Sequence, residues 1–453
     1  MTQTLHEPAR QTPVIGHFDL CVIGGSTTGV FAALAAARAG LRVALVESLG
    51  MFGGTATASM VCVWHSVFDT TYETQIAAGI PLELIERLKP LGAVTEREKS
   101  PEWQFCFNPA EMAIELDRMV EEAGVRPFLH TRFVAPVVDE PGHVTHAIIE
   151  DKTGRRAIAA DMFIDASGDA DLAHRAQMDC YKQPHLQPPT ACVILQGMGG
   201  IYEKDPGFKY ADALFDPQYP EALKPGFAWG ARLPGMDDLN MIAGTRVHGA
   251  DCSDADQFTQ AEMAGRRQIR RISQLLRHRI PGGQKVQTVA IPARIGIRHS
   301  RQVHCLHQLT EDQVLRGERF DDAIANGSYR VDVHSDTGGG LIFRYLDGRE
   351  VEKGPGIHEE RRWAGEGEAT ATFYQIPYRS LVPRGSRNVL VAGRCLDADE
   401  GAFGAVRVMI NCSQTGQAAG TAAATALDAG VAVTDVDPAR LRRRLADAGA
   451  IVL

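Results

Sequence analysis

The chain lacks several features that would mark a secreted, metal-binding or membrane-spanning protein. Its 453 residues include nine cysteines but no C-x-x-C pair, which argues against a disulfide framework, an iron–sulfur cluster or a zinc site. No apolar run approaches the length of a membrane span. Basic residues are in deficit, with 47 Lys and Arg against 56 Asp and Glu and a net charge of −9. We therefore expect a cytoplasmic protein with reduced thiols, no metal site and no nucleic-acid or anionic-membrane partner.

What the sequence does have is a dense glycine-rich signature near its start. Residues 18–47 read as an apolar strand (20–23), a small-residue turn, an alanine-rich helix (30–39) and a second apolar strand (42–46). This order has the size of a nucleotide-binding βαβ unit. A purely structural βαβ unit is the alternative, and the acid that closes the second strand argues against it.

The turn of this unit reads Gly24-Gly25-Ser26-Thr27-Thr28-Gly29 and departs from G-x-G-x-x-G at Ser26. Glycines there let the backbone approach a pyrophosphate, which binds the free N–H groups at the helix N-terminus. Serine is small enough to keep this approach, and the hydroxyls can add donors. Glu47, about 20 residues further on, stands where a carboxylate accepts hydrogen bonds from ribose hydroxyls.

Downstream of this unit, two helices precede a change to a period of two. We expect a short amphipathic helix near 81–88 and a helix at 109–122 with Asn108 as its N-cap. Strand-like segments follow, and Pro-Gly and Thr-Gly turns separate them; they lie at 128–138, 144–149 and 157–163. This pattern predicts an antiparallel meander inserted into an α/β domain.

The middle of the chain is dominated by one long helix, expected at 259–279. Thr259 and Glu262 form a capping-box pattern at its start, and a Pro-Gly-Gly run stops it. Arginines cover most of its surface, which predicts a solvated or inter-subunit face and a possible homodimer. An apolar strand at 388–392 and a single helix at about 405–427 then predict a return to the first domain.

These patterns predict an α/β fold with a nucleotide-binding domain made of two separate segments. Its mostly parallel, Rossmann-like sheet carries the meander, and a second, α+β domain lies between the two segments. The expected boundaries are 1–16 (disordered leader), 17–185 (nucleotide-binding domain, first part, with the meander at about 127–163), 186–375 (substrate or cap domain), 376–430 (returning part) and 431–453 (helical tail).

The order of these segments resembles the flavoproteins with two dinucleotide-binding domains, in the glutathione-reductase-like FAD-binding superfamily. Within it, the chain is most similar to the FAD-dependent oxidoreductase family related to the fumarate reductase and succinate dehydrogenase flavoproteins. The resemblance covers nearly the whole chain. The motifs that carry it are VIGGSTTG with Glu47, GGTATASM from Gly53, FIDASGDADLA from Phe163, GIRHSRQ from Gly296, YQIPYRSLVP from Tyr374 and NVLVAGRCLDADEGAFGAVRVM from Asn388.

The resemblance implies FAD as cofactor and a set of residues that contact it. The turn at 24–29 would hold the pyrophosphate, Glu47 the adenosine ribose, and residues 53–55 the ribityl and flavin end. Many relatives have Gly-Asp where this chain has Gly393-Arg394, and the aspartate of those relatives accepts a hydrogen bond from a ribityl hydroxyl. Arginine cannot accept this bond, so we expect Arg394 to contact a phosphate instead. The helix near residue 405 would point its N–H groups at the flavin pyrimidine. The implied contacts are Gly24, Ser26, Thr27, Thr28, Gly29, Glu47, Gly53, Gly54, Thr55, Val134 (adenine), Ala166, Gly168, Gly393, Arg394 and Val406.

The reaction that follows from this resemblance is hydride transfer between a small or medium organic substrate and flavin N5. Histidine suits proton transfer near neutral pH, and arginine can clamp a carboxylate. The expected catalytic residues are His248, the first choice, with Arg298, Arg301 and His65. Arg246, Tyr378 and Arg379 are further polar candidates. The alternative, that most of these side chains have a purely structural role inside the protein, stays open.

Other readings of the sequence also stay open. A flavin monooxygenase shares the fold, although its Asp-Gly segment is not evident, and FAD could instead be a structural or non-redox cofactor, as in some cyclases and isomerases. The absence of C-x-x-C argues against an electron-transfer subunit with iron–sulfur clusters. No second glycine fingerprint for a nicotinamide is evident, so we expect oxygen, a quinone or a protein as electron acceptor. His65 lies too far beyond the GGT segment for the covalent flavin attachment of some relatives, so we expect tight, non-covalent FAD.

Overall fold

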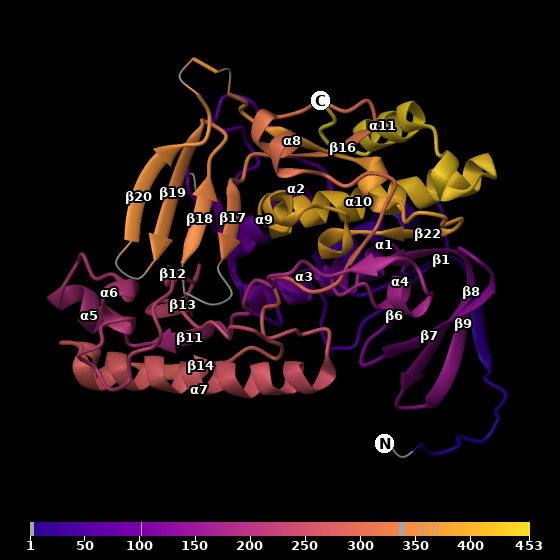
Figure 1. The fold of residues 1–453 in the computed structure, drawn as a ribbon. Coiled ribbons are helices and arrows are strands. Elements are labelled where there is room, and N and C mark those ends of the chain that lie inside the picture. Colours follow the sequence, from indigo (N-terminus) through magenta and orange to yellow (C-terminus); the bar gives the residue numbers. More distant parts are fainter. Residues whose placement is uncertain (1–3, 101, 335–339, 355–356, 366, 369) are drawn as a thin grey trace.

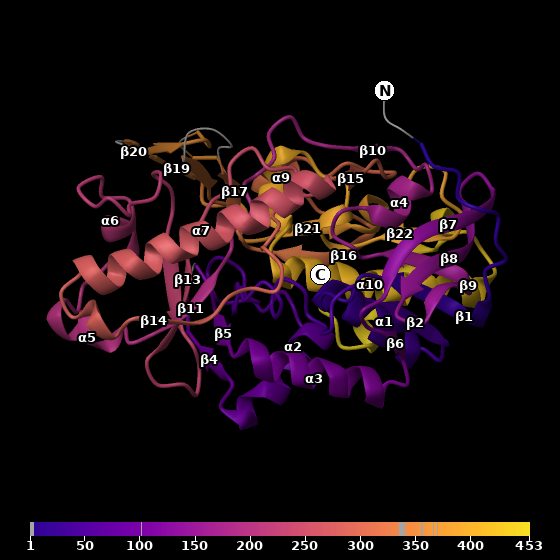
Figure 2. The ribbon, with the colours of Figure 1, turned by 90° about the horizontal axis from the view of Figure 1, so that it is seen from below.

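The computed structural model describes residues 4–100, 102–334, 340–354, 357–365, 367–368 and 370–453. A seven-stranded sheet forms one end of the molecule, and two four-stranded antiparallel sheets form the other (Figure 1). Helices α1 (Thr27–Arg38) and α10 (Met409–Ala429) pack together beside the large sheet. The long helix α7 (Ala255–Arg279) crosses the far end, as the view from below shows (Figure 2).

The expected βαβ unit is confirmed as β1 (Val14–Ile23), α1 and β2 (Val43–Val46), with β1 and β2 parallel. Helix α1 begins three residues earlier than the sequence indicated, directly after Ser26, so the second half of the glycine-rich turn is already helical. Strand β1 also reaches back to Val14, so the last residues of the expected disordered leader are strand.

The large sheet is mostly parallel and carries the antiparallel meander, as the sequence predicted. Its order is β6 (Arg126–Phe128), β2, β1, β9 (Gly154–Asp165), β8 (His143–Asp151) and β7 (Arg132–Glu140). Strand β9 belongs both to the antiparallel meander and to the parallel part of the sheet. Its first half pairs antiparallel with β8, and its last three residues pair in parallel with β22 (Val389–Val391), which arrives more than 220 residues later.

The returning segment contains two helices where the sequence indicated one. Helix α9 (Glu400–Val406) starts at Asp399, whose side chain accepts a hydrogen bond from the Ala402 N–H, and α10 follows after a break. Val408 is extended (φ −66°, ψ 147°) and interrupts the helical hydrogen bonds. The prediction of one helix over 405–427 is therefore wrong, and the break exposes a second helix N-terminus.

Helix α10 then packs closely on α1 through glycines. A Cβ at Gly420 would lie 2.1 Å from the Ala32 carbonyl oxygen, so only glycine allows this backbone approach. Ser413 adds a hydrogen bond of 3.1 Å from its hydroxyl to that of Thr27. Helix α10 is thus fixed directly onto the first helix.

The middle region forms the two smaller sheets and α7. One sheet has the order β12 (Trp229–Arg232), β13 (Leu239–Ala243), β11 (Val193–Gln196) and β14 (Gln287–Ala290). The other runs β17 (Val331–His334), β18 (Leu341–Arg344), β19 (Arg349–Gly354) and β20 (Ile357–Arg362). All their pairings are antiparallel.

Helix α7 starts one turn before the expected capping box. Asp254 is its N-cap and accepts a hydrogen bond from the Gln257 N–H, whereas Thr259 lies inside the helix and donates to the Ala255 carbonyl. Glu262 pairs with Arg266 and accepts from the Ile295 N–H. The capping-box prediction is therefore wrong, and Glu262 instead ties α7 to the segment that follows it.

The remaining elements connect these layers. The helix predictions near 81–88 and at 109–122 are confirmed, with Asn108 as the N-cap of the second. These elements are α2 (Ile80–Leu88), α3 (Pro109–Glu122), α4 (Asp171–Arg175), α5 (Gly199–Lys204), α6 (Tyr210–Leu214), α8 (Glu311–Arg316), α11 (Pro438–Asp447), β3 (Val63–Trp64), β4 (Val94–Glu96), β5 (Phe105–Phe107), β10 (Cys180–Tyr181), β15 (Gln302–Val303), β16 (Ala323–Gly327) and β21 (Tyr374–Pro377). Within the described ranges, no helix combines the length and the apolar character needed to cross a membrane.

Candidate active site

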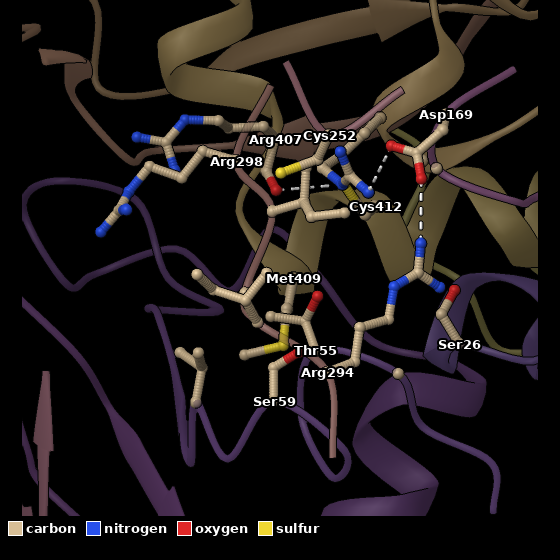
Figure 3. Close-up of a pocket in the computed structure, with 18 of the residues that line it drawn as sticks. Ser26, Thr55, Ser59, Asp169, Cys252, Arg294, Arg298, Arg407, Met409 and Cys412 are labelled. Atoms are coloured by element: carbon tan, nitrogen blue, oxygen red, sulfur yellow. Dashed lines mark hydrogen bonds and ion pairs between the residues drawn. The ribbon is translucent and has the colours of Figure 1, made fainter. Parts of the chain in front are cut away.

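One large cavity, of about 1120 Å³, lies where the segments from all parts of the chain meet. Its wall includes the turn after β1, the 53–55 segment, the turn after β9, residues 293–298, β17 and the break between α9 and α10. Figure 3 shows one side of it with Ser26, Asp169 and Arg294, and the other with Arg298 and Arg407. Thr55, Ser59 and Met409 lie lower in this view, between the two groups.

The turn after β1 is shaped for a close backbone approach. Gly24 has φ +102°, and a Cβ at Gly29 would lie 1.8 Å from the Gly24 carbonyl oxygen, so both positions need glycine. Ser26 is the N-cap of α1 but makes no side-chain capping bond, so its hydroxyl is not used by the helix. Its backbone pairs with Gly53, and this brings the 53–55 segment onto the turn.

Glu47 is buried beside this turn with its carboxylate fixed. One oxygen accepts from the Gly25 N–H at 2.7 Å, and the other accepts from the Leu49 N–H at 2.8 Å and the Ser48 hydroxyl at 3.0 Å. A carboxylate has about four acceptor positions, so capacity remains for a ligand hydroxyl. Glu47 lines the cavity at the place the sequence indicated.

Next to the turn, Asp169 holds two arginines. Arg294 pairs with it at 2.9 Å and Arg394 at 3.4 Å. A Cβ at Gly168 would lie 2.4 Å from Arg394 Nη2, so the glycine makes room for this guanidinium. Arg394 Nη1 is buried without a hydrogen-bond partner in the part of the chain that is described. A donor in that position suits a phosphate oxygen.

The far end of the cavity holds a group of arginines around Thr190. The Thr190 hydroxyl is 2.8 Å from Arg246 Nη1 and 2.6 Å from Arg298 Nη1. Arg407 pairs with Asp332 at 3.2 Å and donates to Gln187 at 3.0 Å. We call Arg246, Arg298 and Arg407 the arginine cluster.

Burial and mutual repulsion set the protonation of this cluster. Burial lowers the pKa of Arg246 to about 10. Burial, followed by the charges of Arg246 and Arg407, holds the pKa of Arg298 well below its usual range. Burial opposes ionisation of Asp332, but His334 and Arg407 outweigh it and hold its pKa well below its usual range. The cluster is thus an electropositive site with one internal counter-charge.

Two aromatic side chains connect the cluster to the middle of the cavity. The rings of His65 and Tyr329 lie 4.1 Å apart, and the Tyr329 hydroxyl donates to Asp332 at 2.8 Å. Burial, with Arg330, lowers the pKa of His65 to about 3, so this imidazole is neutral. Its Nδ1 has no hydrogen-bond partner among the described residues.

Most of the predicted site residues line the cavity. They are Gly24, Ser26, Thr27, Thr28, Glu47, Gly53, Gly54, Thr55, His65, Ala166, Gly168, Arg298, Arg301, Gly393 and Arg394. Arg301 is nevertheless held as a strut, because it donates to the Asp169 carbonyl and pairs with Asp171 at 2.7 Å.

Four predicted site residues lie off the wall. Gly29 packs against Gly24, and the Val134 carbonyl accepts from Arg175, while residues 131–133 beside it do line the cavity. Val406 is buried at the end of α9, and Val408 and Met409 stand on the wall instead. His248, the first catalytic choice, is also absent from the wall. The position of His248 therefore does not support a catalytic role, which stays a prediction.

Several wall residues were missed by sequence reasoning. Tyr329, Asp332 and His334 come from β17 and the turn before it, a segment with no recognisable motif. Arg407 lies inside one of the family-like motifs, but a continuous helix was expected there, and its place in the break was not evident.

A glycine turn at a helix start, a fixed acid after the second strand and a returning strand and helix define a dinucleotide-binding protein of the flavoprotein class. Residues 19–445 match the model of the FAD dependent oxidoreductase family. The chain belongs to this family: it is an FAD-dependent oxidoreductase. No curated protein matches the sequence.

Two solved structures illustrate the similarity. A geranylgeranyl bacteriochlorophyll reductase-like protein from Thermoplasma acidophilum is 12% identical, over 95% of this chain and 82% of that chain, with a TM-score of 0.47. The p-nitrophenol 4-monooxygenase of Pseudomonas putida DLL-E4 is 10% identical, over 95% and 85% of the two chains, with a TM-score of 0.48.

The residues at the Ser26 end of the cavity fit FAD. The N-terminus of α1 and the unpartnered Arg394 Nη1 offer donors for a diphosphate, and Glu47 offers acceptors for a ribose. The N-terminus of α10, at Val408 and Met409, reaches the same cavity further along.

Proposed function

We propose that this enzyme transfers a hydride between an organic substrate and FAD, with the polar end of the substrate in the arginine cluster. The observation that supports this most is the single cavity, which extends from the dinucleotide turn to the arginine cluster. A cofactor bound along the first part leaves the second part for a substrate. Bound FAD supplies the two-electron redox chemistry, and the chain supplies position, charge and a proton carrier.

In this proposal, the turn at 24–29 and Arg394 bind the diphosphate, Glu47 the ribose, and residues 53–55 the flavin end. The N-terminus of α10 stabilises negative charge on the pyrimidine side. Residues 17–185 and 376–430 together form the FAD-binding domain, and residues 186–375 the substrate domain. Nine unpaired cysteines agree with a cytoplasmic location, and the exposed arginines of α7 are the candidate surface for a homodimer.

Arg246 and Arg298 orient the substrate, since each is fixed by a hydrogen bond to Thr190. We assign proton transfer to His65 Nδ1, which faces no protein partner among the described residues. A neutral imidazole can take a proton there, and a bound anion would raise its pKa toward the working range.

The test is anaerobic mixing of the FAD-loaded protein with a panel of alcohols, amines, carboxylates and saturated acyl compounds, followed at the flavin absorbance band. Bleaching by one compound, reversed by an electron acceptor, supports hydride transfer. A compound that is converted without bleaching would instead indicate a non-redox role for FAD, and one converted only with reductant and oxygen would indicate a monooxygenase. Acid precipitation of the same sample should release all the yellow colour, because we propose non-covalent FAD.

A further inference from the structure

The arginine cluster carries more positive charge than the described part of the chain balances. It brings three guanidinium groups together, and Asp332 is the one carboxylate within the described ranges that ion-pairs with any of them, through Arg407. The contacts of Arg246 and Arg298 are with a hydroxyl and with backbone carbonyls, which carry no charge. Buried charges normally have a partner of opposite sign.

Several N–H donors of the arginine cluster are also unpaired. Arg246 Nε and Nη2 and Arg407 Nε are buried and lack a partner in the described structure. Both side chains line the cavity. Such donors are costly when unpaired, and two adjacent donors of one guanidinium match the two oxygens of a carboxylate. An anionic group of the ligand satisfies the charge and the donors together.

The wall next to the cluster is aromatic, and the chain before Phe227 lies against Arg246: a Cβ at Gly226 would be 3.9 Å from Arg246 Cγ. Phe227 and Phe343 form an edge-to-face pair at 6.2 Å, and Trp229 stands at the start of β12 on the same wall. Phe343 belongs to β18, Trp229 to β12, and Phe227 to the segment just before β12, so the two antiparallel sheets both contribute to this wall. Rings in this arrangement suit a planar, apolar body.

Arg330 is a further cation on this side, and its side chain is already engaged by aromatic rings. Arg330 lies over the Phe343 ring at 4.1 Å and near the rings of Tyr329 and Tyr345. The carboxylates whose charges act on it are Asp332 and, more weakly, Glu102, and both line the cavity. The aromatic wall therefore offers one end of the ligand an apolar surface and not a second anion site.

We infer that the substrate is a monocarboxylate with an aromatic body, bound with its carboxylate at Arg246 and its ring at Phe227 and Trp229. This rests on the proposed function in that the same cavity receives the substrate. It differs from a small dicarboxylate, which would need a second anion site and would leave the aromatic wall uncovered.

The test is equilibrium binding to the oxidised, FAD-loaded protein, measured by calorimetry and by the shift in the flavin spectrum. The probes are 3-phenylpropanoate, its neutral amide 3-phenylpropanamide, propanoate and succinate. We expect 3-phenylpropanoate to bind at least about tenfold more tightly than each of the others, because only it uses both the arginine donors and the rings.

Two variants separate the two contacts. Arg246→Met should remove most of the preference for the acid over the amide, and Trp229→Ala most of the preference for 3-phenylpropanoate over propanoate. Arg246→Lys keeps the charge and should retain part of the acid preference. FAD content and the unfolding midpoint show whether each variant is folded. Arg316→Met, on the exposed face of α8, is the matched control and should bind all probes as the parent does.

Binding does not require turnover, so the two proposals fail separately. Equal affinity for acid and amide, or tighter binding of succinate, would overturn the monocarboxylate inference even if some substrate bleaches the flavin. Acid-selective, ring-selective binding without bleaching by any compound would support the inference and remove the hydride-transfer proposal.

Discussion

Gly416 of α10 lies directly against Thr28 of α1: a Cβ at Gly416 would be 2.1 Å from the Thr28 carbonyl oxygen. Thr28 lines the cavity beside the dinucleotide turn. The contact therefore couples the returning segment to the dinucleotide turn, at a position where no side chain fits.

Gly416→Val should separate the two helices and disturb the turn. We expect a loss of about 1–3 kcal/mol in the free energy of unfolding, as for other overpacked interiors, together with lower FAD content. Denaturant unfolding and the ratio of flavin to protein absorbance measure the two effects. Ala429→Val, at the exposed end of the same helix, is the control, and a Gly416→Val protein as stable as this control would contradict the packing argument.

Glu47→Gln should weaken FAD binding without unfolding the protein. The amide oxygen can still accept from one N–H, but the charge that strengthens bonds to ribose hydroxyls is lost. We expect the Kd of FAD to rise by roughly ten- to hundredfold. Fluorescence titration of the apoprotein measures this change. Glu86→Gln, on the exposed side of α2, should leave the Kd unchanged.

Arg394 and Arg301 lie on the same wall and should behave differently. Arg394→Met removes the proposed phosphate contact and should weaken FAD binding by about tenfold or more, with a smaller dependence of the Kd on salt concentration. Arg301→Met removes a strut between Asp169 and Asp171 and should mainly lower the unfolding midpoint. Weaker FAD binding in the Arg301 variant and a lower unfolding midpoint alone in the Arg394 variant would show that Arg301 binds the phosphate and Arg394 is structural.

His65 and His248 provide a test of the proton carrier. His65→Asn should slow anaerobic flavin reduction by roughly 100-fold or more, the usual range for loss of a general acid or base, with unchanged FAD affinity. His248→Ala should leave the rate constant for reduction unchanged, because this side chain is not on the cavity wall. Stopped-flow absorbance measures both rates, and a slow His248 variant beside a normal His65 variant would restore the choice made from sequence.

His299 should make stability fall in acid. It is buried on the face of Phe403, and burial lowers its pKa to about 4, against about 6.5 in an unfolded chain. Between these values the unfolded state binds the extra proton, so stability is lost as the pH falls from 6.5 toward 4. Above pH 6.5 the effect is absent.

The expected slope for one such group approaches about 1.4 kcal/mol per pH unit. His299→Gln should therefore unfold with a shallower pH dependence than the parent below pH 6.5, and with the same dependence above it. Urea unfolding at several pH values measures this difference. Equal slopes for the two proteins would show that His299 keeps an ordinary pKa.

The geometry of the dinucleotide turn was predictable because local chemistry determines it. The turn around Gly24 and the acid Glu47 lie on one βαβ unit, whose spacing alone places them together. Asn108 is a comparable case, because an N-cap acts within its own turn.

The arginine cluster was not predictable because it depends on contacts between distant segments. Arg246 lies after β13, Arg298 after β14 and Arg407 in the break between α9 and α10. The break itself depends on Val408 adopting an extended conformation, which no local pattern among alanines and glycines requires. The capping-box prediction at Thr259 was wrong because the local sequence offers two possible N-caps. Asp254, one turn earlier, is the one the helix uses.

The pairing of β9 with β22 has a consequence for the protein's synthesis. Strand β9 leaves the ribosome long before β22. One edge of its last three residues can pair with β1, but the other edge has no partner strand until the whole middle region has been translated. An open strand edge in a nascent chain invites mispairing. Because Met409 also lines the cavity, the cavity wall is complete only after most of the chain has been translated.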